Sequence, residues 1–227
     1  MAKKKDSREE NLEVVQDALS KTEQYIEDNQ KSLMIIVGAI IAIAILYLAY
    51  TKLYIGPKEE DALSSSFMAE QYFDIDSFRL ALYGDGGSAL GFLTIVEDYG
   101  MTPTGNLANY YAGICYLKMG EFDNAIEYLK SFDSGDEVIS AMAYGALGDA
   151  YSEKGENSDA LTYYMKAGNK DNDFTSPMFL MKAGLIYETR GEYADALKVY
   201  EKIKKDYKQS NEGRYINKYI QRATLNM

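Results

Sequence analysis

The chain contains no histidine and no tryptophan, and it has only one cysteine and three prolines among its 227 residues. The lack of histidine removes the commonest general base and the commonest metal ligand in proteins. A single cysteine, Cys115, excludes an intramolecular disulfide bond. The low proline content leaves long helices uninterrupted. These absences favour a helical protein without imidazole-based chemistry.

No motif in the sequence points to catalysis. The chain has no phosphate-binding loop, no cluster with metal-ligand spacing and no nucleophile beside a base, so we expect no enzyme, no cofactor and no metal. Asp74, Asp76 and Asp85 fit no known calcium loop, and Cys115 is expected to be a small buried hydrophobic residue. The net charge of −11, without a basic stripe, argues against nucleic acid as a partner.

One apolar run stands near the N-terminus. Residues 33–50, LMIIVGAIIAIAILYLAY, carry no charge and would span roughly 27 Å as a helix. A buried core helix is the alternative, but nothing else in the chain is apolar enough to surround it. A cleaved signal peptide is disfavoured by the 32 residues that precede the run. The run therefore predicts a single membrane-spanning anchor.

The basic residues predict the orientation of this anchor. Residues 1–32 hold six lysines and arginines, whereas residues 51–78 hold two. By the positive-inside rule, the N-terminus lies in the cytoplasm and the larger part lies across the membrane. The predicted organisation is a cytoplasmic tail at 1–32, the span at 33–50, a linker at 51–58 and one domain at 59–227. Apolar residues at helical spacing in the tail predict either a short amphipathic helix or a plain helical extension into the span.

A spacing pattern first seen in residues 112–129, AGICYLKMGEFDNAIEYL, recurs twice at steps of 35 and 36 residues. The three copies are Gly113, Tyr116, Gly120, Ala125; Gly148, Tyr151, Gly155, Ala160; and Gly184, Tyr187, Gly191, Ala196. A bulky residue follows each alanine by four positions, namely Leu129, Tyr164 and Tyr200. We expect each copy to be two antiparallel helices that approach closely at the first glycine and the alanine, with the tyrosine filling the gap. The second glycine suits the left-handed end of a helix.

This pattern resembles the tetratricopeptide repeat, although Asn109, Tyr144 and Leu180 stand in place of its leading tryptophan and its closing proline is absent. The predicted fold class is all-α, with a single N-terminal transmembrane helix followed by a tetratricopeptide-like helical-hairpin solenoid. Clear repeats are expected at 106–139, 141–174 and 177–209, a degenerate repeat at 60–101 and a capping helix at 210–224.

The resemblance implies that the first helix of each hairpin lines a protein-binding groove. The predicted groove residues are Tyr110, Ile114, Leu117, Met142, Asp149, Met178, Met181 and Leu185. Three methionines would offer an adaptable apolar surface. The alternative is that flanking helices bury these methionines.

The whole arrangement resembles the YfgM family of membrane-anchored ancillary subunits of the Sec translocon, in a form similar to chains from the Bacteroidota. The resemblance rests on ALSKTEQYIEDNQKSL before the span, GNLANYYAGICYL, FTSPMFLMKAGLIYE and the final YIQRATLNM. It implies a bacterial inner-membrane protein with a periplasmic repeat domain. The implied partners are translocon subunits, a membrane-anchored periplasmic chaperone and exported client proteins. The alternatives are a structural scaffold of another envelope or secretion complex and a cytoplasm-facing targeting receptor.

Overall fold

The computed structural model describes residue 26 and residues 28–227, and within these residues it is built from helices without a β-strand. The predicted all-α fold class is confirmed. The chain divides into two compact units, Met1–Gly56 and Pro57–Met227, which are described separately. The tail predicted at 1–32, with its amphipathic helix, lies almost entirely outside the described residues.

The first unit contains one long apolar helix. Helix α2, Gln30–Ala49, buries none of its residues, and the π-helical turn η1, Tyr50–Ile55, continues it. Among the described residues, this is the one helical stretch long and apolar enough to cross a membrane. The segment predicted as a linker at 51–58 is helical throughout. Pro57 follows η1 and has no N–H to donate back into it, and π turns commonly occur where the regular hydrogen-bond ladder is interrupted.

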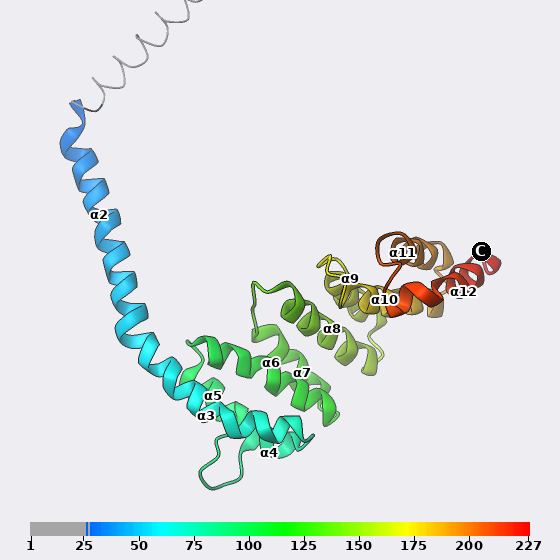
Figure 1. The fold of residues 1–227 in the computed structure, drawn as a ribbon, viewed down its shortest axis with the longest axis horizontal. Coiled ribbons are helices and arrows are strands. Elements are labelled where there is room, and N and C mark those ends of the chain that lie inside the picture. Colours follow the sequence, from blue (N-terminus) through cyan, green and yellow to red (C-terminus); the bar gives the residue numbers. More distant parts are fainter. Residues whose placement is uncertain (1–25, 27) are drawn as a thin grey trace, which may run out of the picture. The chain divides into compact units, whose positions relative to one another are not determined.

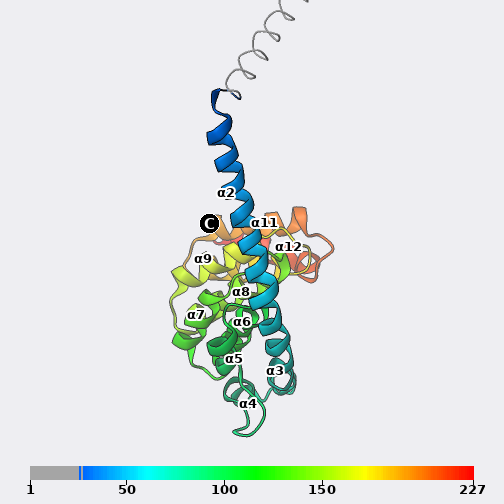
Figure 2. The ribbon, with the colours of Figure 1, turned by 90° about the vertical axis from the view of Figure 1, so that its left-hand side faces the viewer.

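Three helices open the second unit: α3, Gly56–Asp74; α4, Phe78–Tyr83; and α5, Phe92–Tyr99. They gather beside α6 in both views (Figures 1 and 2). An aromatic cluster joins them, because Phe92 stacks on Tyr111 at 4.9 Å between centroids and Phe73 meets Tyr111 edge-on at 5.0 Å. The second helix of the degenerate repeat, expected at 87–101, begins only at Phe92. Four glycines within 84–91 keep the preceding segment out of a helix.

Three helical hairpins follow in series along the chain (Figure 1). They are α6, Pro103–Lys118, with α7, Phe122–Ser131; α8, Glu137–Glu153, with α9, Asn157–Gly168; and α10, Ser176–Thr189, with α11, Tyr193–Asp206. Each hairpin packs on the next, so that one core cluster runs from α3 to α10 and a second joins α10, α11 and α12. This is the predicted solenoid.

The recurring Gly-Glu pair ends the first helix of each hairpin in the same way. Gly120, Gly155 and Gly191 have φ angles of +79°, +76° and +74°. The backbone N–H of the following glutamate donates to the carbonyl of the repeated tyrosine, at 2.9 Å for Glu121, 2.9 Å for Glu156 and 2.8 Å for Glu192. This is the Schellman motif, and it requires a residue that tolerates the left-handed region.

The close approach of the two helices occurs at the other repeated glycine. A methyl group added at Gly113, Gly148 or Gly184 would lie 2.5 Å or less from a side-chain carbon of Leu129, Tyr164 or Tyr200, respectively. The bulky residue of the second helix therefore fills the gap, which corrects the expectation that the repeated tyrosine fills it. Tyr116 and Tyr151 stack instead on Tyr128 and Tyr163, both at 5.4 Å.

Helix α12, Asn211–Leu225, ends the chain in the region where a capping helix is expected. The Ser210 hydroxyl oxygen accepts a hydrogen bond from the backbone N–H of Gly213 at 2.9 Å and so caps its first turn. Ile216 and Ala223 are buried against the second core cluster. The helix covers the apolar face that α10 and α11 would otherwise leave exposed.

Candidate functional site

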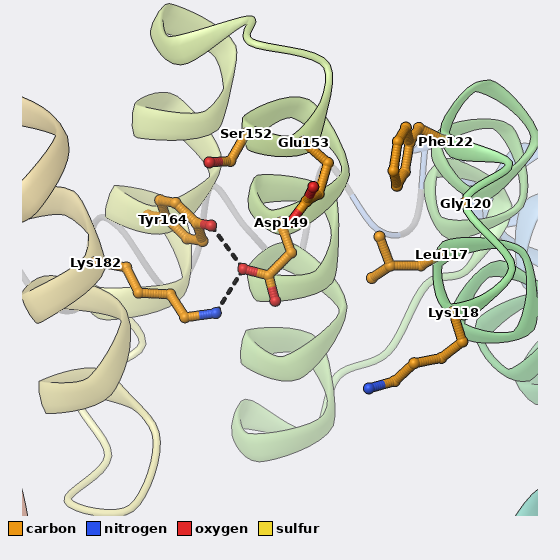
Figure 3. Close-up of a pocket in the computed structure, with 9 residues that line it drawn as sticks. All are labelled: Leu117, Lys118, Gly120, Phe122, Asp149, Ser152, Glu153, Tyr164 and Lys182. Atoms are coloured by element: carbon orange, nitrogen blue, oxygen red, sulfur yellow. Dashed lines mark hydrogen bonds and ion pairs between the residues drawn. The ribbon is translucent and has the colours of Figure 1, made fainter. Parts of the chain in front are cut away.

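A groove of about 500 Å³ lies between the first and third hairpins and crosses the middle one (Figure 3). The end of α6 and the start of α7 form one wall, α8 forms the floor, and α9 and α10 form the other wall. The lining residues are Leu117, Lys118, Gly120, Phe122, Asp149, Ser152, Glu153, Tyr164 and Lys182. The volume lies within the usual range of ligand-binding clefts, about 300–1,000 Å³.

Asp149 organises the polar wall of this groove. One carboxylate oxygen accepts a hydrogen bond from the Tyr164 hydroxyl at 2.6 Å and pairs with the Lys182 ammonium at 2.5 Å (Figure 3). The Asp149 and Lys182 side chains are 35% and 37% exposed, so a ligand can reach both charges. Burial, and then the hydrogen bond to Asp149, raise the pKa of the Tyr164 phenol well above its usual range. The phenol therefore stays protonated and donates to the carboxylate.

The packing of α8, α9 and α10 holds this triad in place. Gly148 lets the Tyr164 ring lie against α8, and Tyr164 stacks on Phe179 at 6.4 Å between centroids. The Lys182 ammonium lies over the rings of both Tyr164 and Phe179, at 5.4 and 5.8 Å. Cation–π contacts of this kind stabilise a lysine head without neutralising it.

The facing wall is apolar and has the exposed lysine Lys118 at its end. In Figure 3 the Leu117 side chain and the Phe122 ring face the gap across from Asp149. Lys118 is exposed at the rim, and Glu153 supplies a second exposed carboxylate. The groove thus combines an apolar surface with charges of both signs, which suits a peptide segment that carries an apolar side chain beside polar groups.

The structure brings two of the eight predicted groove residues, Leu117 and Asp149, into this site. Tyr110 and Ile114 are half-buried against the core, and the Tyr110 ring lies 5.5 Å from that of Phe132. Leu185 is 38% exposed and lies outside the groove lining.

The three predicted methionines also lie outside the groove lining and are half-buried. Met142 and Met178 pack against the first core cluster, and Met181 packs against the second. Each methionine thus contributes to the packing of the repeats and leaves part of its side chain accessible.

Seven residues that line the groove are not among the eight predicted ones: Lys118, Gly120, Phe122, Ser152, Glu153, Tyr164 and Lys182. Tyr164 carried a usable signal, since it stands at the bulky position of the repeat. Lys182 follows the predicted Met181 directly, but only the packing of three helices reveals that it reaches Asp149.

Cys115 is fully buried, and burial raises the pKa of its thiol to about 12. A thiol that stays protonated at neutral pH is a poor nucleophile. Among the described residues, no group of three or more histidine, cysteine or carboxylate side chains is placed to hold a metal ion.

The fold and the groove define a class of protein, the helical-repeat scaffold that binds other proteins. Residues 107–133 and 179–210 match one model of the tetratricopeptide repeat, and residues 141–167 match another. These three segments overlap the stretches in which the spacing predicts repeats, and each of them is similar to the tetratricopeptide repeat. No curated protein matches the chain in sequence.

A solved structure shares the fold. It is a crystal structure from Podosopora anserina, described as a kinesin light chain with nearly identical TPR-like repeats. The TM-score is 0.53 and the sequence identity is 13%, and the match covers 74% of this chain and 87% of the other. At this identity the likeness concerns the fold alone.

Proposed function

We propose that this protein is a membrane-anchored protein-binding module that captures partner segments in the groove around Asp149. The observation that carries the proposal is the groove itself, where an apolar wall faces a charged triad that a ligand can reach. An apolar side chain of the partner would contact Leu117 and Phe122. A carboxylate or amide of the partner would contact Lys118 and Lys182.

The partners fit the polarity of this site. Newly exported chains expose apolar side chains flanked by polar groups until they fold, and a mixed groove binds such segments without demanding one sequence. The resemblance to ancillary translocon subunits supports a position beside the Sec pore, with exported proteins, a membrane-anchored chaperone or translocon subunits as partners. Helix α2 would anchor the protein, and the excess of basic residues before it supports a periplasmic repeat domain.

Site-directed photocrosslinking tests the groove in living cells. A photoreactive phenylalanine analogue replaces Phe122, which lines the groove, and in a matched control it replaces Phe174, which is 80% exposed outside the groove. We expect crosslinks from position 122 to several exported proteins or to translocon subunits, and none of these from position 174. Equal crosslinks from both positions, or none from 122, would contradict groove binding.

The same experiment separates the alternatives. A single constant partner from an envelope or secretion complex would identify a scaffold instead of a module for exported proteins. Protease added to cells with a permeabilised outer membrane tests the orientation. Digestion of the repeat domain is expected, and full protection would place this domain in the cytoplasm and exclude exported clients.

A further inference from the structure

Lysines and tyrosines gather on a second surface, which the middle hairpin forms together with Lys130 of α7. We call this surface the lysine–tyrosine strip and define it by six residues: Lys130, Tyr151, Tyr163, Lys166, Tyr144 and Lys170. The Lys130 ammonium donates a hydrogen bond to the Tyr151 hydroxyl at 2.8 Å, and Tyr151 stacks on Tyr163 at 5.4 Å between centroids.

At the other end of the strip, two lysine ammonium groups lie over the ring of Tyr144. The Lys166 ammonium lies 4.9 Å from the centroid of Tyr163 and 5.9 Å from that of Tyr144. The Lys170 ammonium lies 5.5 Å from the centroid of Tyr144. A cleft of about 730 Å³ opens beside these residues, and it shares no lining residue with the groove around Asp149.

The charge of this cleft is unusual for the protein. The chain has 35 acidic and 24 basic residues, yet two lysines and no carboxylate line the cleft. The lining residues are Tyr144, Leu161, Thr162, Met165, Lys166, Asn169, Lys170 and Tyr187. By contrast, the groove around Asp149 and two other pockets of the repeat region contain both signs of charge.

The lysines of the strip form no close ion pair in the described part of the chain. Within residue 26 and residues 28–227, none of Lys130, Lys166 and Lys170 forms an ion pair with a carboxylate, whereas Lys154, Lys182, Lys198 and Lys202 all do. Lys166 lies in the last turn of α9 and Lys170 in the turn that follows it, and both ammonium groups lie over the Tyr144 ring, so their like charges repel one another. The dipole at the C-terminal end of α9 and the tyrosine rings offset part of this repulsion, but in the described part of the chain no carboxylate pairs with either ammonium.

We propose that the lysine–tyrosine strip is a second binding site, for an acidic segment of a partner protein that also carries an aromatic side chain. The carboxylates of the segment would pair with Lys166 and Lys170. The aromatic side chain would lie in the cleft against Tyr144, Leu161 and Met165. The site shares no lining residue with the groove around Asp149, and its proposal does not rest on the function proposed for that groove.

An acidic protein segment fits this surface better than nucleic acid does. Nucleic acid binding needs enough cations to neutralise a run of phosphates, and the strip has three lysines on a chain of net charge −11. A short acidic segment needs only two or three pairings, and the net charge of the chain repels it far less.

Selection from a phage-displayed library of random peptides on the purified full-length protein, in detergent, tests the proposal. The variants are Lys166→Gln with Lys170→Gln, and a matched control with Lys204→Gln and Lys205→Gln at two exposed lysines outside the strip. Both double variants change the net charge equally. A third variant, Lys166→Arg with Lys170→Arg, keeps the positive charge.

We expect selected peptides that combine aspartate or glutamate with an aromatic residue. Their affinity should fall about 3- to 30-fold on the strip double variant, as expected for the loss of two partly exposed charge pairs. It should be unchanged on the control and retained on the arginine variant, and salt should weaken it.

Three results would overturn the proposal: selected peptides without acidic enrichment, equal binding to the strip variant and the wild type, or binding of single-stranded RNA or anionic lipid vesicles at the strip in preference to the peptides. Phe122→Ala should leave acidic-peptide binding intact, so a failure at the strip is distinguishable from a failure at the groove.

Discussion

Replacing Gly148 with alanine should destabilise the middle hairpin, although alanine is the better helix former. The added Cβ would lie 2.5 Å from both Cδ1 and Cε1 of Tyr164, whereas carbon atoms pack at about 3.5–4.0 Å. The ring has little room to move, because Tyr164 is 4% exposed, stacks on Phe179 and is hydrogen-bonded to Asp149.

The expected magnitude follows from two opposing effects. Overpacking of this kind costs about 1–3 kcal/mol, and the higher helix propensity of alanine offsets about 1 kcal/mol of it. The net loss of up to about 2 kcal/mol corresponds to a decrease of up to roughly 8 °C in melting temperature for a domain of this size. Thermal unfolding of the full-length protein in detergent, followed by far-ultraviolet circular dichroism, measures this shift.

A double-mutant cycle isolates the cause. In a Tyr164→Ala background the collision is absent, so Gly148→Ala should become neutral or stabilising by up to about 1 kcal/mol. If Gly148→Ala is harmless in the wild type, or equally costly in both backgrounds, then close contact with Tyr164 is not the reason for glycine at this position.

Two further predictions concern pH and helix capping. Burial raises the pKa of the Tyr116, Tyr164 and Tyr200 phenols in the folded protein, whereas tyrosine in an unfolded chain titrates near pH 10. The free energy of unfolding should therefore keep its full value below about pH 10. Above that pH it should fall by about 1.4 kcal/mol per pH unit for each phenol. Phenolate absorbance near 295 nm should therefore rise together with loss of helix, and titration of all tyrosines in a still-folded chain would contradict this. The Glu59 carboxylate accepts two hydrogen bonds from Thr104, one from its backbone N–H at 3.1 Å and one from its hydroxyl at 2.8 Å. Glu59→Ala should therefore lower the free energy of unfolding, measured by thermal unfolding, by about 1–2 kcal/mol. The matched control Glu60→Ala, at an exposed neighbour, should lower it by almost nothing.

The repeats were predictable because each depends on short-range spacing. A glycine that must adopt a positive φ, followed by glutamate, marks the end of the first helix in all three hairpins. The glycine seven residues before this turn glycine and the bulky residue nine residues after it mark the closest approach of the two helices. Such features recur at fixed separations, so the sequence reveals them without knowledge of the tertiary structure.

The sequence indicated which face of the first helices would line the groove, but it did not indicate which side chains meet there. The resemblance to the tetratricopeptide repeat placed Leu117 and Asp149 on the groove face of the first helices, but the Asp149 triad joins residues from α8, α9 and α10. Whether Lys182 or Met181 points into the site depends on the rotation of α10 against α9, which tertiary packing decides. The Glu59–Thr104 contact, 45 residues apart along the chain, was invisible in the sequence for the same reason.

The middle hairpin connects the two proposed sites through residues that are close neighbours in the sequence. On α9, Tyr164 belongs to the groove and Tyr163 to the lysine–tyrosine strip; on α8, Asp149 and Tyr151 are divided in the same way. Both sites therefore depend on the distance between α8 and α9, which Gly148 sets. Phe122→Ala should weaken only groove binding, and Lys166→Gln with Lys170→Gln should weaken only strip binding. Gly148→Ala should weaken both, because displacing the Tyr164 ring separates the helices that carry the Tyr151–Tyr163 stack.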